Sequence, residues 1–154
     1  MSIILSIDSK ESVEIKQSDL ANVISWLDDD VCYAFLYSSL VGHAASEVRS
    51  EIARKTTIPV EVLEQLVSDV SIEVVRQVAN NDRALQVLKL AQFEVIINRD
   101  VSVAADITEN LSMIREDVRE DVINILLKHT DPMVVKAVEN YIKYSAEMAV
   151  DETL

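Results

Sequence analysis

A short phrase, in which two branched apolar residues stand four positions apart, occurs four times in this chain. The copies occupy residues 48–54, 74–81, 103–110 and 134–140, so they start 26, 29 and 31 residues apart. Residues four apart lie on one face of a helix, and each copy therefore predicts a helix with one apolar face. Repetition at this spacing is typical of a supersecondary unit that stacks on copies of itself.

A second stretch with helical spacing of apolar residues lies between successive copies. The apolar positions are Val60, Leu63, Leu66 and Val67, then Ala84, Leu85, Leu88 and Ala91, then Ile114, Val118, Val122, Ile125 and Leu126. Each of these stretches predicts one helix that follows the helix of the phrase. The unit is therefore a helix pair, which buries its apolar face only by stacking on neighbours.

Polar residues near the ends of the phrases predict where these helices begin and end. Ser71, Asp100 and the Asp131-Pro132 pair are predicted to begin helices, because a short polar side chain caps the first free N–H groups and proline fits the first turn. Asparagine tolerates the left-handed backbone that ends a helix. The helix ends are therefore predicted at Asn80, Asn110 and Asn140.

A family resemblance rests on the first two copies and the segment that joins them. Its residues are Val48-Arg49, Ile52-Ala53, Thr57-Ile58-Pro59, Val62-Leu63, Leu66, Asp69, Val74-Val75-Arg76 and Val78-Ala79-Asn80. They resemble the leucine-rich repeat variant, a HEAT-like helical repeat of bacteria. The resemblance is best over residues 47–81 and extends over 44–144, although Ala104-Ala105 replaces the usual Val-Arg pair in the third copy.

The resemblance implies an all-α fold, a short HEAT-like α-solenoid of stacked helix pairs, and it implies no shared reaction. The founding members carry a cysteine-rich iron–sulfur segment before the repeats. Cys32 is the single cysteine of this chain, which therefore cannot hold such a cluster by thiolates. No cofactor is expected.

Residues 1–17 follow a different pattern. Ile3, Leu5 and Ile7 alternate with other residues, as do Val13 and Ile15, and residues 8–12 are typical of a turn. A small β-hairpin is predicted, which either packs on the first helices, pairs with another chain or frays as a tail. Residues 18–154 are predicted to form a single helical-repeat domain, which begins with a helix capped by Ser18.

The chain lacks the parts of familiar catalytic and nucleotide-binding sites. Its one glycine, Gly42, excludes glycine-rich phosphate loops. His43 and His129 lie at predicted helix ends, where a structural role is expected, and Cys32 stands among apolar residues without an identifiable base. We therefore predict no catalytic, cofactor-binding or metal-binding residues, and a protein that is not an enzyme.

Charge is the remaining indication of function. The formal net charge is −13, which argues against a surface that binds nucleic acid directly. No stretch is long or apolar enough to span a bilayer, and one cytoplasmic domain without a membrane partner is expected. Glu116 with Glu120, and Asp117 with Asp121, stand at the helical spacing that places like charges side by side.

These observations predict a non-catalytic protein–protein interaction module that presents an acidic surface to a basic protein partner; a homodimer is compatible with them. The alternative is an acidic inhibitor or immunity-type protein that mimics nucleic acid and blocks a basic groove of an enzyme. If the second helices line the concave side, the partner-binding residues are Glu61, Glu64, Gln65, Gln86, Lys89, Glu116, Asp117, Glu120, Asp121 and Asn124.

The aromatic residues gather near the two ends of the helical region. Trp26, Tyr33, Phe35 and Tyr37 lie in the first helices, and Tyr141 and Tyr144 lie in the last. Packing in the core is expected for most of them. Any that are exposed become candidates for binding hot spots, because large rigid aromatics contribute strongly to interfaces.

Overall fold

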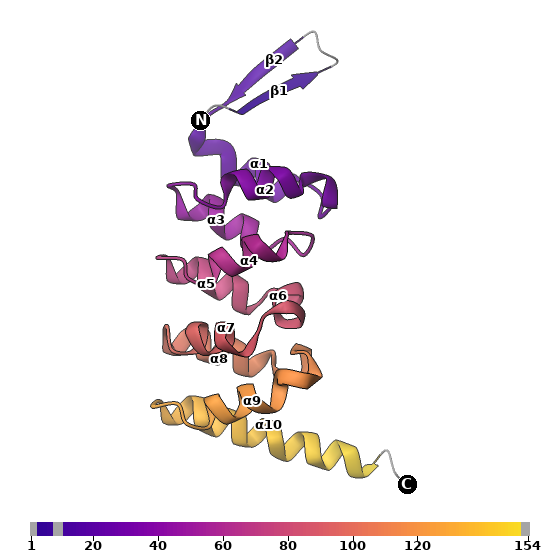
Figure 1. The fold of residues 1–154 in the computed structure, drawn as a ribbon, viewed down its shortest axis with the longest axis vertical. Coiled ribbons are helices and arrows are strands. Elements are labelled where there is room, and N and C mark those ends of the chain that lie inside the picture. The colour runs from indigo at the N-terminus through magenta and orange to yellow at the C-terminus, as the bar shows by residue number, and fades with distance from the viewer. Residues whose placement is uncertain (1–2, 8–10, 152–154) are drawn as a thin grey trace.

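The computed structural model describes residues 3–7 and 11–151, and it is mostly helical, as predicted (Figure 1). The hairpin strands are β1 (Ile3–Ile7) and β2 (Glu11–Ile15). The first helices are α1 (Leu20–Trp26), α2 (Ala34–Leu40), α3 (Ser46–Ala53), α4 (Val60–Leu66) and α5 (Ile72–Ala79). The later helices are α6 (Asp82–Val87), α7 (Leu90–Ile97), α8 (Val101–Glu109), α9 (Glu116–Leu126) and α10 (Pro132–Asp151). Short 3-10 turns cover Gln17–Asp19, Val31–Tyr33 and Leu111–Met113.

The helices follow one another along the long axis of the molecule in chain order (Figure 1). One column consists of α1, α3, α5, α8 and α10, each in contact with the next. On the other side α4 contacts α6, and α7 contacts α9. Each helix therefore packs mainly on elements that are near it in the sequence.

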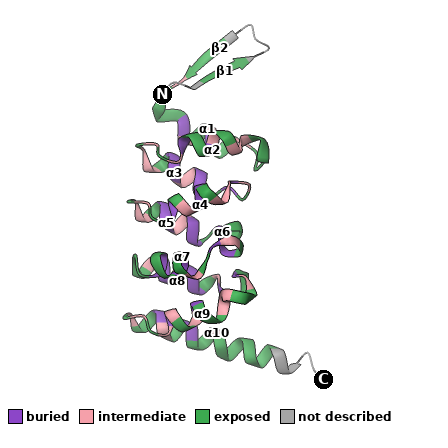
Figure 2. Cartoon of the chain, viewed as in Figure 1, coloured by how far each residue is buried: buried purple, intermediate pink, exposed green. Residues whose placement is uncertain are grey.

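The apolar pairs of the four phrases form the centre of this packing. Val48 with Ile52, Val74 with Val78, Val103 with Ile107 and Val134 with Val138 are all buried, in α3, α5, α8 and α10 respectively. Buried side chains run along the stack from Leu20 to Val138 (Figure 2). The helical register predicted from the phrases is confirmed, because both members of each pair face the core.

Asparagine side chains connect successive helices of this column. The buried Asn81 amide donates to the Ala53 carbonyl at 2.7 Å and to the Lys55 carbonyl at 2.9 Å, while its oxygen accepts from the N–H of Ala84. Asn110 donates to the Asn80 side chain at 2.9 Å. The ends of α3, α5 and α8 are thereby tied together.

The predicted helix ends are correct at two of three asparagines. Asn80 and Asn110 follow α5 and α8 directly, but their φ angles are −103° and −100°, so neither adopts the left-handed conformation. Asn140 does not end a helix, since α10 continues to Asp151. The residues after Asn140 include neither glycine nor proline, and nothing in the local sequence stops the helix.

Two further expectations are corrected. The stretch from Ala84 to Ala91 forms parts of two helices, because Leu88 adopts an extended backbone (ψ 144°), and its side chain is fully buried in the core. Ser18 does not cap α1. It lies inside the 3-10 turn, Asp19 is the residue that precedes α1, and the Ser18 hydroxyl donates to the Asp19 carboxylate at 3.2 Å.

The predicted hairpin is present. Its strands pair antiparallel, with Ile3 opposite Ile15 and Ile7 opposite Glu11. Residues 8–10 of the predicted turn lie outside the described residues. The hairpin projects beyond α1 at one end of the stack, and the side chains of Ile4 and Val13 are each 61% exposed (Figure 1).

The connection between α1 and α2 is fixed by one carboxylate. Asp29 accepts four hydrogen bonds of 2.6 to 2.9 Å, from the N–H and hydroxyl groups of Thr56 and Thr57. Burial alone would raise the pKa of Asp29, but these four hydrogen bonds outweigh it and lower the pKa to about 2. The carboxylate thus joins the α1–α2 loop to the α3–α4 loop.

Replacement of Asp29 by asparagine should lower the free energy of unfolding by about 1 kcal/mol at neutral pH, since the exposed site is screened by solvent. A depressed pKa stabilises the fold above the unfolded value and loses that contribution as pH falls. The difference between wild type and Asp29→Asn should therefore shrink between pH 4 and about 2 in urea titrations. Asp28→Asn, at the neighbouring exposed carboxylate, is the control; an equal loss in both variants would contradict the prediction.

Candidate functional site

Two arginines form ion pairs that join neighbouring parts of the stack, each with an aspartate from a later segment of the chain. The Arg49 guanidinium donates to both Asp69 oxygens at 2.6 and 2.8 Å, and also to the His43 carbonyl at 2.6 Å. Arg76 donates to both oxygens of Asp106 at 2.7 and 3.2 Å. These pairs join α3 to the segment before α5, and α5 to α8.

Other cations bind backbone carbonyls in the connections between helices. The donors and acceptors are Lys55 to Leu27 (2.5 Å), Arg83 to Ile58 (3.2 Å), Arg99 to Asp69 (3.0 Å) and Arg119 to Ile114 (2.7 Å). Leu27 follows α1 directly, and Ile58, Asp69 and Ile114 lie in the connections before α4, α5 and α9, so these carbonyls need partners from outside the helices. Much of the positive charge of the chain therefore holds the stack together.

Most of the carboxylates, by contrast, are exposed. Exposed examples on the helices from α4 to α10 are Glu61, Glu73, Asp82, Glu94, Glu109, Glu116, Asp117, Glu120, Asp121 and Glu139. Because these arginines and Lys55 bind groups of the stack and the formal net charge is −13, the outer surface carries an excess of negative charge. This surface would attract a cationic partner at low ionic strength.

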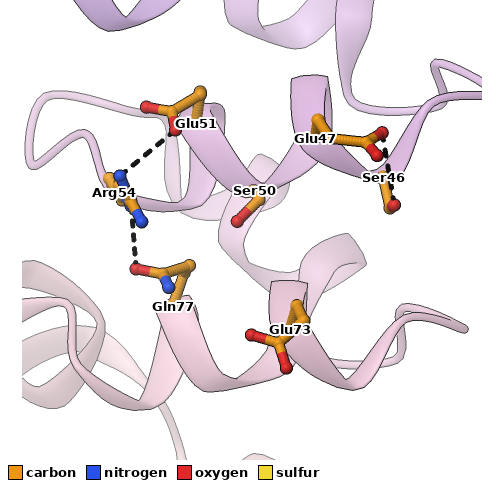
Figure 3. A pocket seen from close by; sticks show the side chains of 7 residues that line it. All are labelled: Ser46, Glu47, Ser50, Glu51, Arg54, Glu73 and Gln77. Atoms are coloured by element: carbon orange, nitrogen blue, oxygen red, sulfur yellow. Dashed lines mark hydrogen bonds and ion pairs between the residues drawn. The ribbon is translucent and has the colours of Figure 1, made fainter. Parts of the chain in front are cut away.

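One part of the acidic surface is hollowed into a groove between α3 and α5 (Figure 3). Its volume is about 280 Å³. The lining side chains from α3 and its end are Ser46, Glu47, Ser50, Glu51 and Arg54, and those from α5 are Glu73 and Gln77. We call these seven residues the α3–α5 groove.

Three carboxylates and one guanidinium face the α3–α5 groove. Arg54 lies at one end, where it donates to Glu51 at 3.2 Å and to Gln77 at 3.0 Å (Figure 3). Glu47 accepts a long hydrogen bond of 3.4 Å from Ser46. No hydrogen bond or ion pair to Glu73 is found among the described residues. Glu47 from α3 and Glu73 from α5 therefore give the groove a negative charge, which favours a cationic group.

Sequence reasoning did not identify this groove, although a signal was present. Glu47 and Glu73 each stand directly before the first valine of their phrase, and Glu51 and Gln77 each stand three residues after it. Equivalent positions of stacked units lie one above the other, so comparing the first two phrases would have placed these side chains together.

The predicted binding residues of α4, α6 and the start of α7 are partly brought together. Glu64 and Lys89 form an ion pair at 3.5 Å. Gln86 donates to the backbone carbonyl of Met113, so its amide has a structural partner. Glu61 and Gln65 are exposed on α4. This part of the predicted surface is mixed in charge.

The predicted residues on α9 form a more uniform surface. Glu116, Asp117, Glu120, Asp121 and Asn124 are all exposed on this one helix. Asp117 pairs with Arg115, which precedes the helix. Carboxylates in the first turn are favoured by the helix dipole, which compensates part of their mutual repulsion. We call Glu116, Asp117, Glu120 and Asp121 the α9 acidic face; it lies further along the stack than the α3–α5 groove (Figure 1).

Cysteine and histidine side chains, which often act in catalysis or bind metals, have local structural roles in this protein. The hydrogen bond with Asp30 raises the pKa of the exposed Cys32 thiol, which makes it a weak nucleophile at neutral pH. The Nδ1 atoms of His43 and His129 accept from the backbone N–H of Ala45 and Asp131, both at 3.1 Å. Each imidazole therefore accepts a hydrogen bond from a backbone N–H group two residues later in the chain. Within residues 3–7 and 11–151, no group of three or more histidine, cysteine and carboxylate side chains could hold a metal ion.

Comparison with known proteins adds no relative to this picture: no family model, curated protein or solved structure matches the chain. Among the described residues, no helix has both the length and the apolar character needed to cross a bilayer.

Proposed function

We propose that this chain is a short HEAT-like α-solenoid that acts as a non-catalytic protein–protein interaction module, with an acidic surface that binds a basic protein partner. The observation that carries the proposal is the separation of charge. Arg49, Arg76 and Arg99 are engaged within the stack, while the carboxylates of the α9 acidic face and the α3–α5 groove point outward.

Two features support the repeat architecture in this proposal. The four phrases supply equivalent buried pairs to α3, α5, α8 and α10, and these helices contact one another in order. Asn81 and Asn110 make hydrogen bonds to the end of the preceding helix in the column. An extended surface of this kind is the usual basis for binding in helical-repeat proteins.

The proposed function is tested first by affinity capture from cell lysate at low and high salt. We expect a specific basic protein to be retained at low salt and lost at high salt, because contacts between exposed charges are screened. If that protein is a nuclease whose activity is blocked, the module acts as a nucleic-acid mimic. If the captured proteins are neutral and are retained equally at low and high salt, an electrostatic role for the surface would be contradicted.

The α9 acidic face is tested with the double variant Glu116→Lys and Glu120→Lys. Association with the captured partner should slow about tenfold at low ionic strength and lose much of its salt dependence, because steering depends on the charge presented. Folding should be retained, with a stability change within about 0.5 kcal/mol. Association rates are measured by stopped flow across a salt series.

The matched control is Glu94→Lys with Glu139→Lys, which changes the net charge equally on α7 and α10. An equal effect of both double variants would show that only net charge matters. If neither variant slows association, Glu47→Lys with Glu73→Lys would test the α3–α5 groove instead.

A further inference from the structure

Three large apolar side chains at the N-terminal end of the helical stack are exposed. Trp26 is 80%, Val31 72% and Phe35 84% exposed. They lie within ten consecutive residues, and the five steps of the chain from Trp26 to Val31 can span at most about 17 Å. Val31 and Phe35 are four apart across a 3-10 turn and α2, which places them on one side. We call these three residues the α1–α2 patch.

The backbone that carries the α1–α2 patch is held at several points. Asp29 binds Thr56 and Thr57, the Asp30 carboxylate accepts from the N–H of Cys32 at 2.7 Å, and the Leu27 carbonyl accepts from Lys55. Aromatic anchors on a pre-formed scaffold lose little conformational entropy on binding. Tyr37, by contrast, lies on the same helix and is fully buried, so the exposure of Phe35 does not result from a loosely packed helix.

The charges beside the patch favour one kind of occupant. Asp28 and Asp30 are exposed in the loop between Trp26 and Val31. A second copy of this chain would bring its own aspartates against them, and it would add to the repulsion between two molecules of net charge −13. A segment with an apolar stripe flanked by lysine or arginine complements both features.

We propose that the α1–α2 patch binds a cationic amphipathic helix of the protein partner, with Trp26, Val31 and Phe35 contacting its apolar stripe and Asp28 and Asp30 contacting its flanking cations. The inference rests on the proposed function and names the kind of segment that the partner presents. It places the aromatic anchor of binding at the opposite end of the stack from the α9 acidic face (Figure 1).

Trp26 provides a direct readout, because it is the single tryptophan of the chain. The full chain is titrated with a leucine–lysine amphipathic peptide of about 18 residues, long enough to form a helix. We expect a saturable shift of the emission to shorter wavelength as the indole leaves water. The apparent affinity should fall about tenfold between about 50 mM and about 300 mM salt. A leucine–glutamate peptide of the same pattern should cause no shift.

Two variants test the residues. Phe35→Ala should weaken peptide binding about tenfold while Trp26 still reports it, whereas Met133→Ala, at an exposed apolar residue of α10, should leave it unchanged. Asp28→Asn with Asp30→Asn should weaken binding several-fold, and asparagine at position 30 retains an oxygen that can cap Cys32. Circular dichroism and thermal melting verify that each variant is folded.

Any of three results would overturn the inference. They are the absence of an emission shift with the leucine–lysine peptide, an equal shift with the leucine–glutamate peptide, and binding that Phe35→Ala leaves unchanged. A concentration-dependent shift without peptide would assign the patch to a second copy, and a shift only with phosphatidylcholine vesicles would assign it to a membrane. The Glu116→Lys, Glu120→Lys variant should still bind the peptide, so failure of the α9 test and failure of this one are separate outcomes.

Discussion

Replacing Val78 by aspartate should unfold the protein or lower its free energy of unfolding by several kcal/mol. Val78 is fully buried in α5, between α3 and α8 in the column. The substitution would place a carboxylate without a partner in an apolar core, and its desolvation costs a large part of the margin of about 5–15 kcal/mol that holds a domain folded. Urea titration followed by circular dichroism measures the loss.

The matched control is Val70→Asp, which makes the same chemical change at a valine that is 85% exposed. It should change stability by less than about 0.5 kcal/mol. A cooperatively melting Val78→Asp protein with the stability of Val70→Asp would show that the register of α5 is wrong. Loss of folding in both variants would point to the added charge, not to burial, as the cause.

The second large effect is expected at the ion pair between Arg49 and Asp69. Their side chains are only 9% and 7% exposed. Arg49→Ala should cost about 3 kcal/mol or more, because it leaves the Asp69 carboxylate buried without its guanidinium and the His43 carbonyl without its donor. Arg76→Ala should cost only about 1 kcal/mol, since the Arg76 side chain is 38% exposed and solvent can replace part of its pairing with Asp106.

The pH dependence of the Arg49→Ala variant is a separate check on the cause. Burial alone would raise the pKa of Asp69, but the Arg49 hydrogen bonds, helped by the Ser71 N–H, lower it. In wild type the stabilisation is present above the unfolded pKa and is lost as pH falls. In Arg49→Ala the Asp69 carboxyl stays buried and loses its main partner, so protonating it removes an unpaired buried charge and stabilises the variant. The stability difference should therefore narrow on acidification; a constant difference would indicate lost packing instead.

The helical faces of this protein could be predicted because they depend on local geometry. Two branched residues four apart share a helix face wherever the helix packs, and all four predicted pairs are buried. Two of the three caps predicted at the phrases are local in the same way, whereas Ser71 precedes α5 but its hydroxyl makes no capping hydrogen bond. Asp100 and Asp131 accept from backbone N–H groups two residues later, at 2.8 Å in both cases. The accepting carboxylate and the donating N–H are only two residues apart in the chain, so the local sequence contains the whole interaction.

The break at Leu88 shows where local reasoning fails. The apolar spacing of Ala84, Leu85 and Leu88 suits one helix, yet Leu88 is extended and fully buried. Its burial in the core comes from tertiary packing, which outweighs the high helix propensity of leucine. Phe35 and Tyr37 are two residues apart on α2, so helix geometry places them on different sides, but only the packing of α2 on α3 decides which of the two is buried.

Local patterns in the sequence are enough to predict the amphipathic helices, the buried side chains of the phrases and the large negative charge. How that charge is arranged on the surface depends on how the units pack. The partners of Arg49, Arg76 and Asn81 lie 20 to 30 residues away, and the phrases are spaced unequally at 26, 29 and 31 residues. A pairing over that distance depends on how one unit stacks on the next, which periodicity along a single helix does not contain.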